Sequence, residues 1–289
     1  MTTEPLDFTG ERFTPECVRE MRYEHWHRYA FAQSLAAGRR VLDAACGEGY
    51  GSAMLAPVAA SVVGFDIADE AVMHAGQRYR RDNLSFRQGD CTDPSGLPDG
   101  PFDLIVSFET LEHVHEQSRM LAAFAERLSD DGILLVSSPD KLNYSDRRNY
   151  QNEFHVRELY RDELETLLAG HFPATRLYAQ KLAFQSLLWS LDGRVDRYDA
   201  AVLAEDGESL ATTLDYPPMY YVAACARKAS ALDALPALSL FGDLEESVYR
   251  HYEHEIRKNM SAGARIQELE QALADAQRRI AELAPGQGD

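Results

Sequence analysis

The sequence predicts an α/β fold, a doubly wound parallel sheet with helices on both faces. Continuous apolar runs such as residues 102–108 and 132–137 are typical of parallel strands that are buried on both sides. Helical patterns such as residues 120–128 separate these runs, and strand–helix alternation at this spacing indicates βαβ units. In residues 41–51 an apolar run ends in an acid and glycines then recur at every second position, as expected where a buried strand turns tightly into a helix.

The strands follow in chain order from their apolar runs and from the acids that end them. The first three end at Asp43, Asp66 and Asp90. Because ligands bind at the carboxyl ends of strands in open α/β sheets, these three acids mark the expected site. The later strands are residues 102–108, 132–137, 174–180 and 220–226, and the last two are expected to form an antiparallel pair.

The order of these features resembles the class I S-adenosylmethionine-dependent methyltransferases over residues 38–226. A nicotinamide dehydrogenase would instead carry Gly-x-Gly-x-x-Gly, without an acid just before the glycines. A turn that binds nothing is the other alternative for a lone glycine pair. The resemblance implies a Rossmann-like methyltransferase sheet of seven strands and an enzyme that uses S-adenosylmethionine. The residues that carry it are Asp43, Gly47, Gly49, Asp66 and Asp90.

The resemblance also assigns parts of the cofactor to residues. Gly47 and Gly49 would line the methionine moiety. Asp66 would hold the ribose hydroxyls, and Asp90 would bind the adenine amino group. One position departs from the family, which usually has glycine where Ala45 stands. The full set of expected cofactor contacts is Arg28, Asp43, Ala45, Gly47, Gly49, Tyr50, Asp66, Ile67, Asp90, Cys91 and Phe108.

The composition limits which kinds of partner the protein is expected to bind and where in the cell it is expected to be found. The 289 residues are 45% hydrophobic, enough for one substantial core with a smaller appendage, and the formal net charge is −18. Such a charge repels phosphate backbones and argues against a nucleic-acid partner, whereas a neutral small molecule or a sugar is easily accommodated. The four cysteines show neither metal-ligand spacing nor a disulfide framework. The sequence has no long apolar run and no signal-type segment, which predicts no membrane span and a cytoplasmic protein.

Three segments are expected along the chain. Residues 1–37 form an aromatic-rich lid over the cofactor, residues 38–228 form the methyltransferase domain, and residues 229–289 form a helical tail. Within the domain, residues 181–219 form a long insertion between the last two strands. Because long insertions in compact domains are often functional, we assign this one to substrate enclosure, by analogy with the fold. Arg28 of the lid is expected to contact the cofactor carboxylate.

The tail carries a heptad pattern over residues 262–283. In a parallel pair of such helices, Arg265 at position g would face Glu270 at position e of the partner. A single amphipathic helix that packs on the core is the alternative, but the narrow apolar stripe between polar residues favours a coiled coil. The expected partner is a second copy of the chain or a protein tethered through this helix. The a and d residues are Ile266, Leu269, Leu273, Ala276, Ile280 and Leu283.

A group of possible metal ligands follows the fourth strand. If a helix begins there, Glu109, Glu112 and His113 stand at i, i+3 and i+4 on one face, beside the methyl donor. Two carboxylates and an imidazole would repel one another unless they shared a cation or a proton, and an oxygen-rich site suits Mg²⁺ or Mn²⁺. The pattern resembles two metal-dependent O-methyltransferase families, which act on the 2′-hydroxyl of small RNAs and on phenolic hydroxyls in ubiquinone biosynthesis. The RNA family has a further histidine ligand after the fifth strand, which gives His155 that role here.

These residues predict S-adenosylmethionine-dependent O-methylation of a sugar, a glycan or a related small molecule, with His155, His113 and Glu112 as catalytic groups. The sugar follows from a further resemblance to bacterial methyltransferases of glycan and secondary-metabolite assembly. One alternative is a metal-independent O- or N-methyltransferase of a nucleotide sugar, amino sugar or natural product, with His155 or His115 as general base. Another is an inert scaffold that recruits partners through its tail. The second resemblance lies in residues 9–12, 25–29, 46–51, 107–113 and 152–159.

Overall fold

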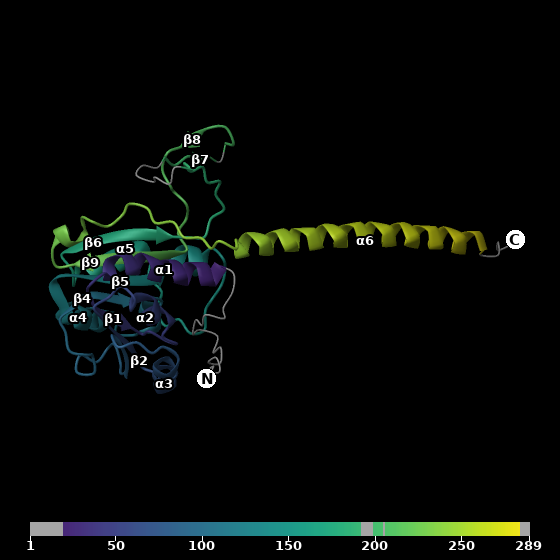
Figure 1. The fold of residues 1–289 in the computed structure, drawn as a ribbon. Coiled ribbons are helices and arrows are strands. Elements are labelled where there is room, and N and C mark those ends of the chain that lie inside the picture. The colour runs from purple at the N-terminus through teal and green to yellow at the C-terminus, as the bar shows by residue number, and fades with distance from the viewer. Residues whose placement is uncertain (1–19, 192–198, 205, 284–289) are drawn as a thin grey trace. The chain divides into compact units, whose positions relative to one another are not determined.

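The computed structural model describes residues 20–191, 199–204 and 206–283 (Figure 1). Residues 1–19 of the predicted lid lie outside the described residues, as do parts of the predicted insertion. No helix in the described part of the chain is long and apolar enough to cross a membrane. Two compact units make up the chain, Met1–Phe241 and Gly242–Asp289.

The first unit is built on a seven-stranded sheet with the strand order β3-β2-β1-β4-β5-β9-β6 (Figure 1). Strands β1 to β5 pair in parallel with their neighbours, whereas β9 runs antiparallel to both β5 and β6. This confirms the predicted α/β sheet and its terminal antiparallel pair. The strands are β1 (Arg40–Ala44), β2 (Ser61–Asp66), β3 (Leu84–Gln88), β4 (Phe102–Ser107), β5 (Leu128–Pro139), β6 (Ala174–Gln180) and β9 (Tyr220–Ala226), with a separate pair of short strands, β7 (Val202–Leu203) and β8 (Leu210–Ala211).

The neighbouring strands β1 and β4 mark the point in the sheet where the strand order reverses. From β1 it adds β2 and β3 on one side, and then returns to add β4 and β5 on the other. The loops that follow β1 and β4 therefore lead away from each other. In such sheets this divergence leaves a crevice at the carboxyl ends of the strands, which is the usual place for a ligand.

Successive residues of the central strands pack into two separate hydrophobic clusters. In β4, Leu104 and Val106 belong to one cluster and Ile105 to the other, because neighbouring side chains of a strand point to opposite faces. Phe31 of α1 packs in the first cluster and Phe124 of α4 in the second, so helices cover both faces. The helices are α1 (Glu20–Ala36), α2 (Tyr50–Leu55), α3 (Asp69–Arg78), η1 (Leu111–His113), α4 (Gln117–Arg127), η2 (Leu142–Asp146), α5 (Arg161–Ala169), η3 (Ala229–Leu232) and α6 (Ser247–Leu283).

The insertion between β6 and β9 begins and ends at neighbouring residues. Gln180 and Tyr220 are opposite each other in the antiparallel pair. The Met219 N–H also donates to the Gln180 carbonyl at 3.0 Å, which closes the base of the insertion. Its described residues include the short strands β7 and β8. Its assignment to substrate enclosure stays a prediction.

Helix α6 forms most of the second unit and is 37 residues long. It contains the whole heptad segment, residues 262–283, and begins well before it. Of the predicted helical tail, residues 229–289, the structure shows the short helix η3 and the long helix α6, and residues 233–246 between them form no helix. Pairing of α6 in a coiled coil stays a prediction.

The turn from β1 into α2 depends on left-handed backbone conformations. Ala45, Gly47 and Gly49 have φ values of 59°, 53° and 90°. A residue with a side chain loses roughly 1–2 kcal/mol in this region, which explains why glycine is usual at the position of Ala45. At Gly49 a Cβ atom would also lie 2.7 Å from the Ala75 Cβ and 2.9 Å from the Phe86 Cε1. Position 49 therefore requires glycine for two independent reasons.

We expect Gly49→Ala to lower the free energy of unfolding by about 3 kcal/mol, because it combines left-handed strain with overpacking. Gly76→Ala in α3 is the matched control. A Cβ at position 76 meets nothing within 4 Å, so the same substitution should raise the free energy of unfolding by up to about 1 kcal/mol through helix propensity. Urea denaturation of both variants measures the two effects, and equal values would contradict this account of the turn.

Candidate functional site

A cavity of about 730 Å³ opens at the carboxyl edge of the sheet. This volume lies within the range of roughly 300–1,000 Å³ that is usual for small-molecule sites. Arg28, Asp43 and Gly49, three of the predicted cofactor contacts, are not among the residues that line it. The predicted site residues that do line it are Ala45, Gly47, Tyr50, Asp66, Ile67, Asp90, Cys91, Phe108, Glu109, Glu112, His113, His115 and His155.

Asp43 lies beneath the glycine-rich turn and is completely buried. Its carboxylate accepts hydrogen bonds from the Tyr29 hydroxyl at 3.0 Å and the Ser52 hydroxyl at 2.6 Å. Burial raises the pKa of Asp43 to about 7, although both hydroxyl bonds oppose that shift. The carboxylate therefore joins β1 to α1 and α2. Its predicted contact with a cofactor stays a prediction.

Asp66 and Asp90 lie at the cavity wall as predicted. Asp66 accepts the Gly47 N–H at 2.7 Å and the Ala68 N–H at 2.9 Å, so it holds the turn while facing the cavity. Asp90 accepts the backbone N–H and the hydroxyl of Thr92, both at 2.7 Å and both through Oδ1. Each carboxylate oxygen has two lone pairs, so both side chains can still accept hydrogen bonds from a ligand.

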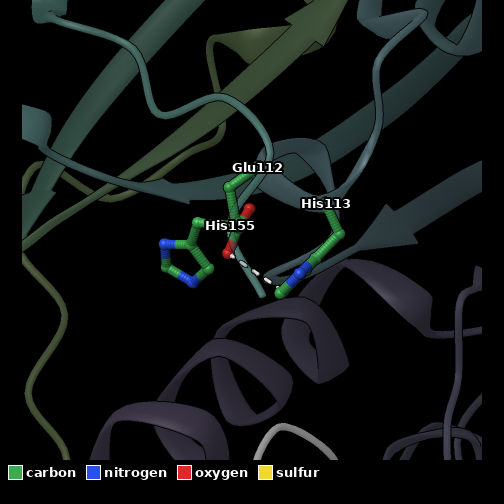
Figure 2. A group of neighbouring side chains, drawn as sticks. All are labelled: Glu112, His113 and His155. Carbon is green, nitrogen blue, oxygen red and sulfur yellow. Dashed lines mark ion pairs between the residues drawn. The ribbon is translucent and has the colours of Figure 1, made fainter. Parts of the chain in front are cut away.

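A second group of side chains lies in the same cavity. Glu112, His113 and His155 offer ligand atoms that all lie within 4.8 Å of one another (Figure 2). The Nε2 of His113 is 4.0 Å from the Glu112 Oε1, and the two imidazole rings meet edge to face with centroids 5.0 Å apart. The Glu112 side chain is only 1% exposed. These three residues, called the Glu-His-His cluster below, could hold a metal ion.

The predicted helix that would begin at Glu109 is wrong. Glu109 has a left-handed backbone with φ of 51°, the short helix η1 follows, and α4 begins only at Gln117. The Glu112 carbonyl instead accepts the N–H groups of Val156 and Arg157 at 2.8 and 2.9 Å. This backbone pairing brings the loop of His155 beside η1. The cluster therefore arises from two loops that pair with each other, and not from one face of a helix.

Hydrogen bonds orient both histidines of the cluster. The His113 Nδ1 lies 3.0 Å from the Phe154 carbonyl, and the His155 Nδ1 lies 2.6 Å from the Glu158 carboxylate. Because these oxygens accept, each Nδ1 carries a proton, and in the neutral tautomer of each ring this leaves the Nε2 lone pair for a ligand. The Asn152 amide donates to the His155 Nε2 at 3.0 Å, and a cation would take the place of that N–H. Metal-bound histidines usually show this same support at the other ring nitrogen.

Glu109 is the one predicted metal ligand that lies outside the cluster. Its carboxylate accepts the Ser137 hydroxyl at 2.6 Å and lies 3.3 Å from a terminal nitrogen of Arg28. Arg28 is 2% exposed, stacks on the Tyr220 ring at 4.6 Å and donates to the Gln180 amide oxygen at 2.8 Å. In the structure, Glu109 and Arg28 thus form an ion pair with each other. Their predicted roles toward a metal and a cofactor stay predictions.

Several cavity residues were missed by the sequence reasoning. Helix α1 contributes Met21 and His25. Tyr144 stacks on His155 with centroids 5.4 Å apart, and it lines the cavity together with Tyr150. Glu48 of the turn was also missed; it does not line the cavity but is buried, and its carboxylate contacts His74, Arg78 and Tyr79 of the α3 region. The position of Glu48 between two glycines could have drawn attention to it in the sequence. Nothing in the sequence near Tyr144 and Tyr150 indicates that they line the cavity.

Comparison with known proteins gives consistent matches. A family profile described as a methyltransferase domain matches residues 18–186, more than half of the chain. A protein of Mycolicibacterium smegmatis named as a probable S-adenosylmethionine-dependent methyltransferase is 38% identical over 167 residues, which cover 56% of this chain and 63% of that relative. A Mycobacterium tuberculosis protein named in the same way is 38% identical over 167 residues, or 60% of its length. The chain thus spans less than two thirds of both relatives.

Two further similarities are more distant. A ubiquinone biosynthesis O-methyltransferase of Psychrobacter cryohalolentis is 31% identical over 106 residues, which cover 35% of this chain and 41% of that protein. Among solved structures, a SAM-dependent methyltransferase from Archaeoglobus fulgidus superposes with a TM-score of 0.50 at 14% identity, over 70% of this chain and 93% of that one. At this identity the structural match shows the fold alone.

Glu24 of α1 provides a test of the buried charges beside the cavity. Burial raises its pKa to about 7, and the nearby Arg28 only partly opposes this. The folded protein therefore holds a proton that the unfolded chain releases near pH 4.5. This contribution to stability is fully present below pH 4.5 and is lost as the pH rises through about 7. Between these values wild type should lose up to about 1.4 kcal/mol per pH unit relative to Glu24→Gln, measured by urea denaturation. Parallel pH profiles would contradict the raised pKa.

Proposed function

The chain belongs to the methyltransferase domain family, and we propose that it transfers the methyl group of S-adenosylmethionine to a hydroxyl oxygen of a sugar, a glycan or a related small molecule. One observation supports this most strongly. The same cavity is lined by Gly47 of the glycine-rich turn, by the strand-terminal acids Asp66 and Asp90, and by the Glu-His-His cluster. A donor bound beside the turn and an acceptor bound at the cluster would therefore meet in one cavity.

The residues at the strand ends fit S-adenosylmethionine. Asp66 can accept from a ribose diol, and Asp90 can accept from an amino group while Thr92 fixes its orientation. Gly47 has a left-handed backbone and no side chain, so the turn can approach a ligand closely. When bound, S-adenosylmethionine supplies an electrophilic methyl group on a sulfonium. The protein contributes the alignment of the acceptor oxygen with that methyl group.

The Glu-His-His cluster fits a divalent cation. It offers two imidazole nitrogens and one carboxylate, and each imidazole is supported at Nδ1. Of the two cations that the sequence predicts, Mn²⁺ matches this donor set better than Mg²⁺, because Mg²⁺ binds oxygen ligands almost exclusively. When bound, the cation would orient two neighbouring hydroxyls and lower the pKa of one. Glu112 and the two histidines would hold it, and Glu158 would keep His155 in the required tautomer.

A hydroxyl acceptor fits the chemistry around the cluster. Tyr144, Tyr150 and Tyr220 line the cavity near His155, and aromatic side chains suit the apolar faces of sugars and of phenolic rings. The net charge of −18 does not oppose a neutral acceptor. The similarity to a ubiquinone biosynthesis O-methyltransferase also supports oxygen as the acceptor atom.

A metal-independent reaction is the second candidate, and it rests on the His155–Glu158 pair. The carboxylate at 2.6 Å from Nδ1 would stabilise a protonated ring after Nε2 had taken a proton. In this form His155 acts as a general base toward a hydroxyl or an amine. His115 also lines the cavity but lies outside the Glu-His-His cluster.

Removal of the ribose ligand tests the cofactor assignment. Asp66→Ala should weaken the binding of S-adenosylhomocysteine by about 2–4 kcal/mol, because hydrogen bonds to a charged group contribute roughly 1.5–3 kcal/mol each. Isothermal titration calorimetry measures this. Asp69→Ala, an exposed acid in the first turn of α3, is the matched control and should bind normally. Unchanged affinity in a folded Asp66→Ala variant would contradict the assignment.

Metal titration tests the cation without any knowledge of the acceptor. Wild type should bind one Mn²⁺ per chain by electron spin resonance. His155→Ala should lose most of this affinity, because one of three ligands is removed, and Glu158→Gln should weaken it by about 10- to 100-fold through loss of ligand support. His115→Ala is the matched control and should bind Mn²⁺ as wild type does.

Turnover then separates the two candidate mechanisms. With radiolabelled S-adenosylmethionine and a panel of sugars, excess EDTA should abolish methyl transfer and leave cofactor binding intact. Full turnover in excess EDTA would contradict a role for the metal ion in methyl transfer. If turnover then also fell in Glu158→Gln, the His155–Glu158 pair would be the base.

A further inference from the structure

Helix α6 exposes a narrow row of large apolar side chains. Ile266, Leu269, Leu273 and Ile280 are 55%, 52%, 59% and 68% exposed. They follow the a and d spacing of a heptad, with Ala276 in the remaining position. We call these five residues the α6 seam. The side chain of Leu283, the sixth residue of the pattern, lies outside the described side chains.

Outside the α6 seam, residues 262–282 of this helix are polar or small, and two of their arginines pair locally. Arg265 pairs with Glu268 at 2.8 Å, and Arg278 pairs with Asp275. Such pairs make the outer faces of the helix soluble without any partner. A helix that packs on a globular core needs a wider apolar face than this, whereas a strip of a and d residues matches the width of a coiled-coil seam.

We propose that the α6 seam docks on the α6 seam of a second copy of this chain, as a parallel two-stranded coiled coil. The choice of residues supports two parallel strands, because two of the three a positions hold β-branched Ile266 and Ile280, with Leu273 between them, and leucine occupies d position 269. β-Branched residues at a with leucine at d favour the parallel dimer over higher oligomers.

The charges beside the seam select the same orientation. In a parallel pair, position g faces position e of the following heptad, so Arg265 of each copy meets Glu270 of the other. In an antiparallel pair the g positions face each other, and Arg265 would meet Arg279. The first arrangement gives two attractive pairs and the second gives two repulsive ones. The seam is only three heptads long and includes a small alanine layer, so we expect a reversible dimer in the micromolar range.

Sedimentation velocity on the full chain over a concentration series tests the dimer. Wild type should change from monomer to dimer as its concentration rises. Leu273→Glu places a charge in the seam and should remain monomeric, while its helix content by circular dichroism stays near that of wild type. Gln267→Glu adds the same charge on the outer face and should dimerise as wild type does. A wild type that is monomeric throughout, or a Leu273→Glu variant that still dimerises, would overturn the proposal.

A charge swap tests the orientation. Arg265→Glu should weaken the dimer by about fivefold, as expected for the loss of two exposed ion pairs. Combining it with Glu270→Arg should restore the wild-type dissociation constant. If Arg265→Glu strengthened the dimer, the helices would be antiparallel, and the parallel arrangement would be refuted.

Discussion

The buried carboxylate of Asp43 organises the parts of this molecule that surround the cavity. It ends β1 and receives hydroxyl groups from Tyr29 of α1 and Ser52 of α2. Tyr29 also packs edge-on against Tyr50 and Phe108, so the same contact positions the loop after β4. Since the carboxylate is fully buried, losing either hydroxyl would leave a polar group without compensation. One acid thus couples helix α1, the glycine-rich turn and the loop that follows β4.

The Glu-His-His cluster depends on a different kind of contact, between the backbones of two loops. The Glu112 carbonyl receives two N–H groups from the segment after His155, and the Gln117 amide donates to the carbonyls of Leu111 and Arg157. These bonds fix the separation of the loops, which in turn fixes the separation of the two imidazoles. The rigid sheet supplies only the ends from which the loops start.

Patterns within short stretches predicted most of the fold, and contacts between distant residues account for the rest. The strands and the glycine-rich turn follow from local apolar runs and from residues such as Gly49. The conformation of Glu109 could not follow from its neighbours, because Arg28 and Ser137 hold its side chain from other elements. The role of Glu158 was missed for another reason: it stands only three residues after His155, but the loop conformation that brings its carboxylate to the His155 Nδ1 has no local sequence signal. The sequence motif therefore indicated three of the four side chains correctly as neighbours, Glu112, His113 and His155, but neither the place of Glu109 nor the backbone pairing that brings the three together.

The closed base of the insertion between β6 and β9 has a consequence for how this enzyme family can change. Gln180 and Tyr220 pair across the sheet, and both contact Arg28, so the ends of the insertion are held independently of what lies between them. The entropy of closing a loop grows only slowly with its length. Residues 181–219 can therefore be lengthened, shortened or exchanged at little cost to folding. Evolution or protein engineering can therefore exchange this segment while the sheet and the cavity at its carboxyl edge stay unchanged.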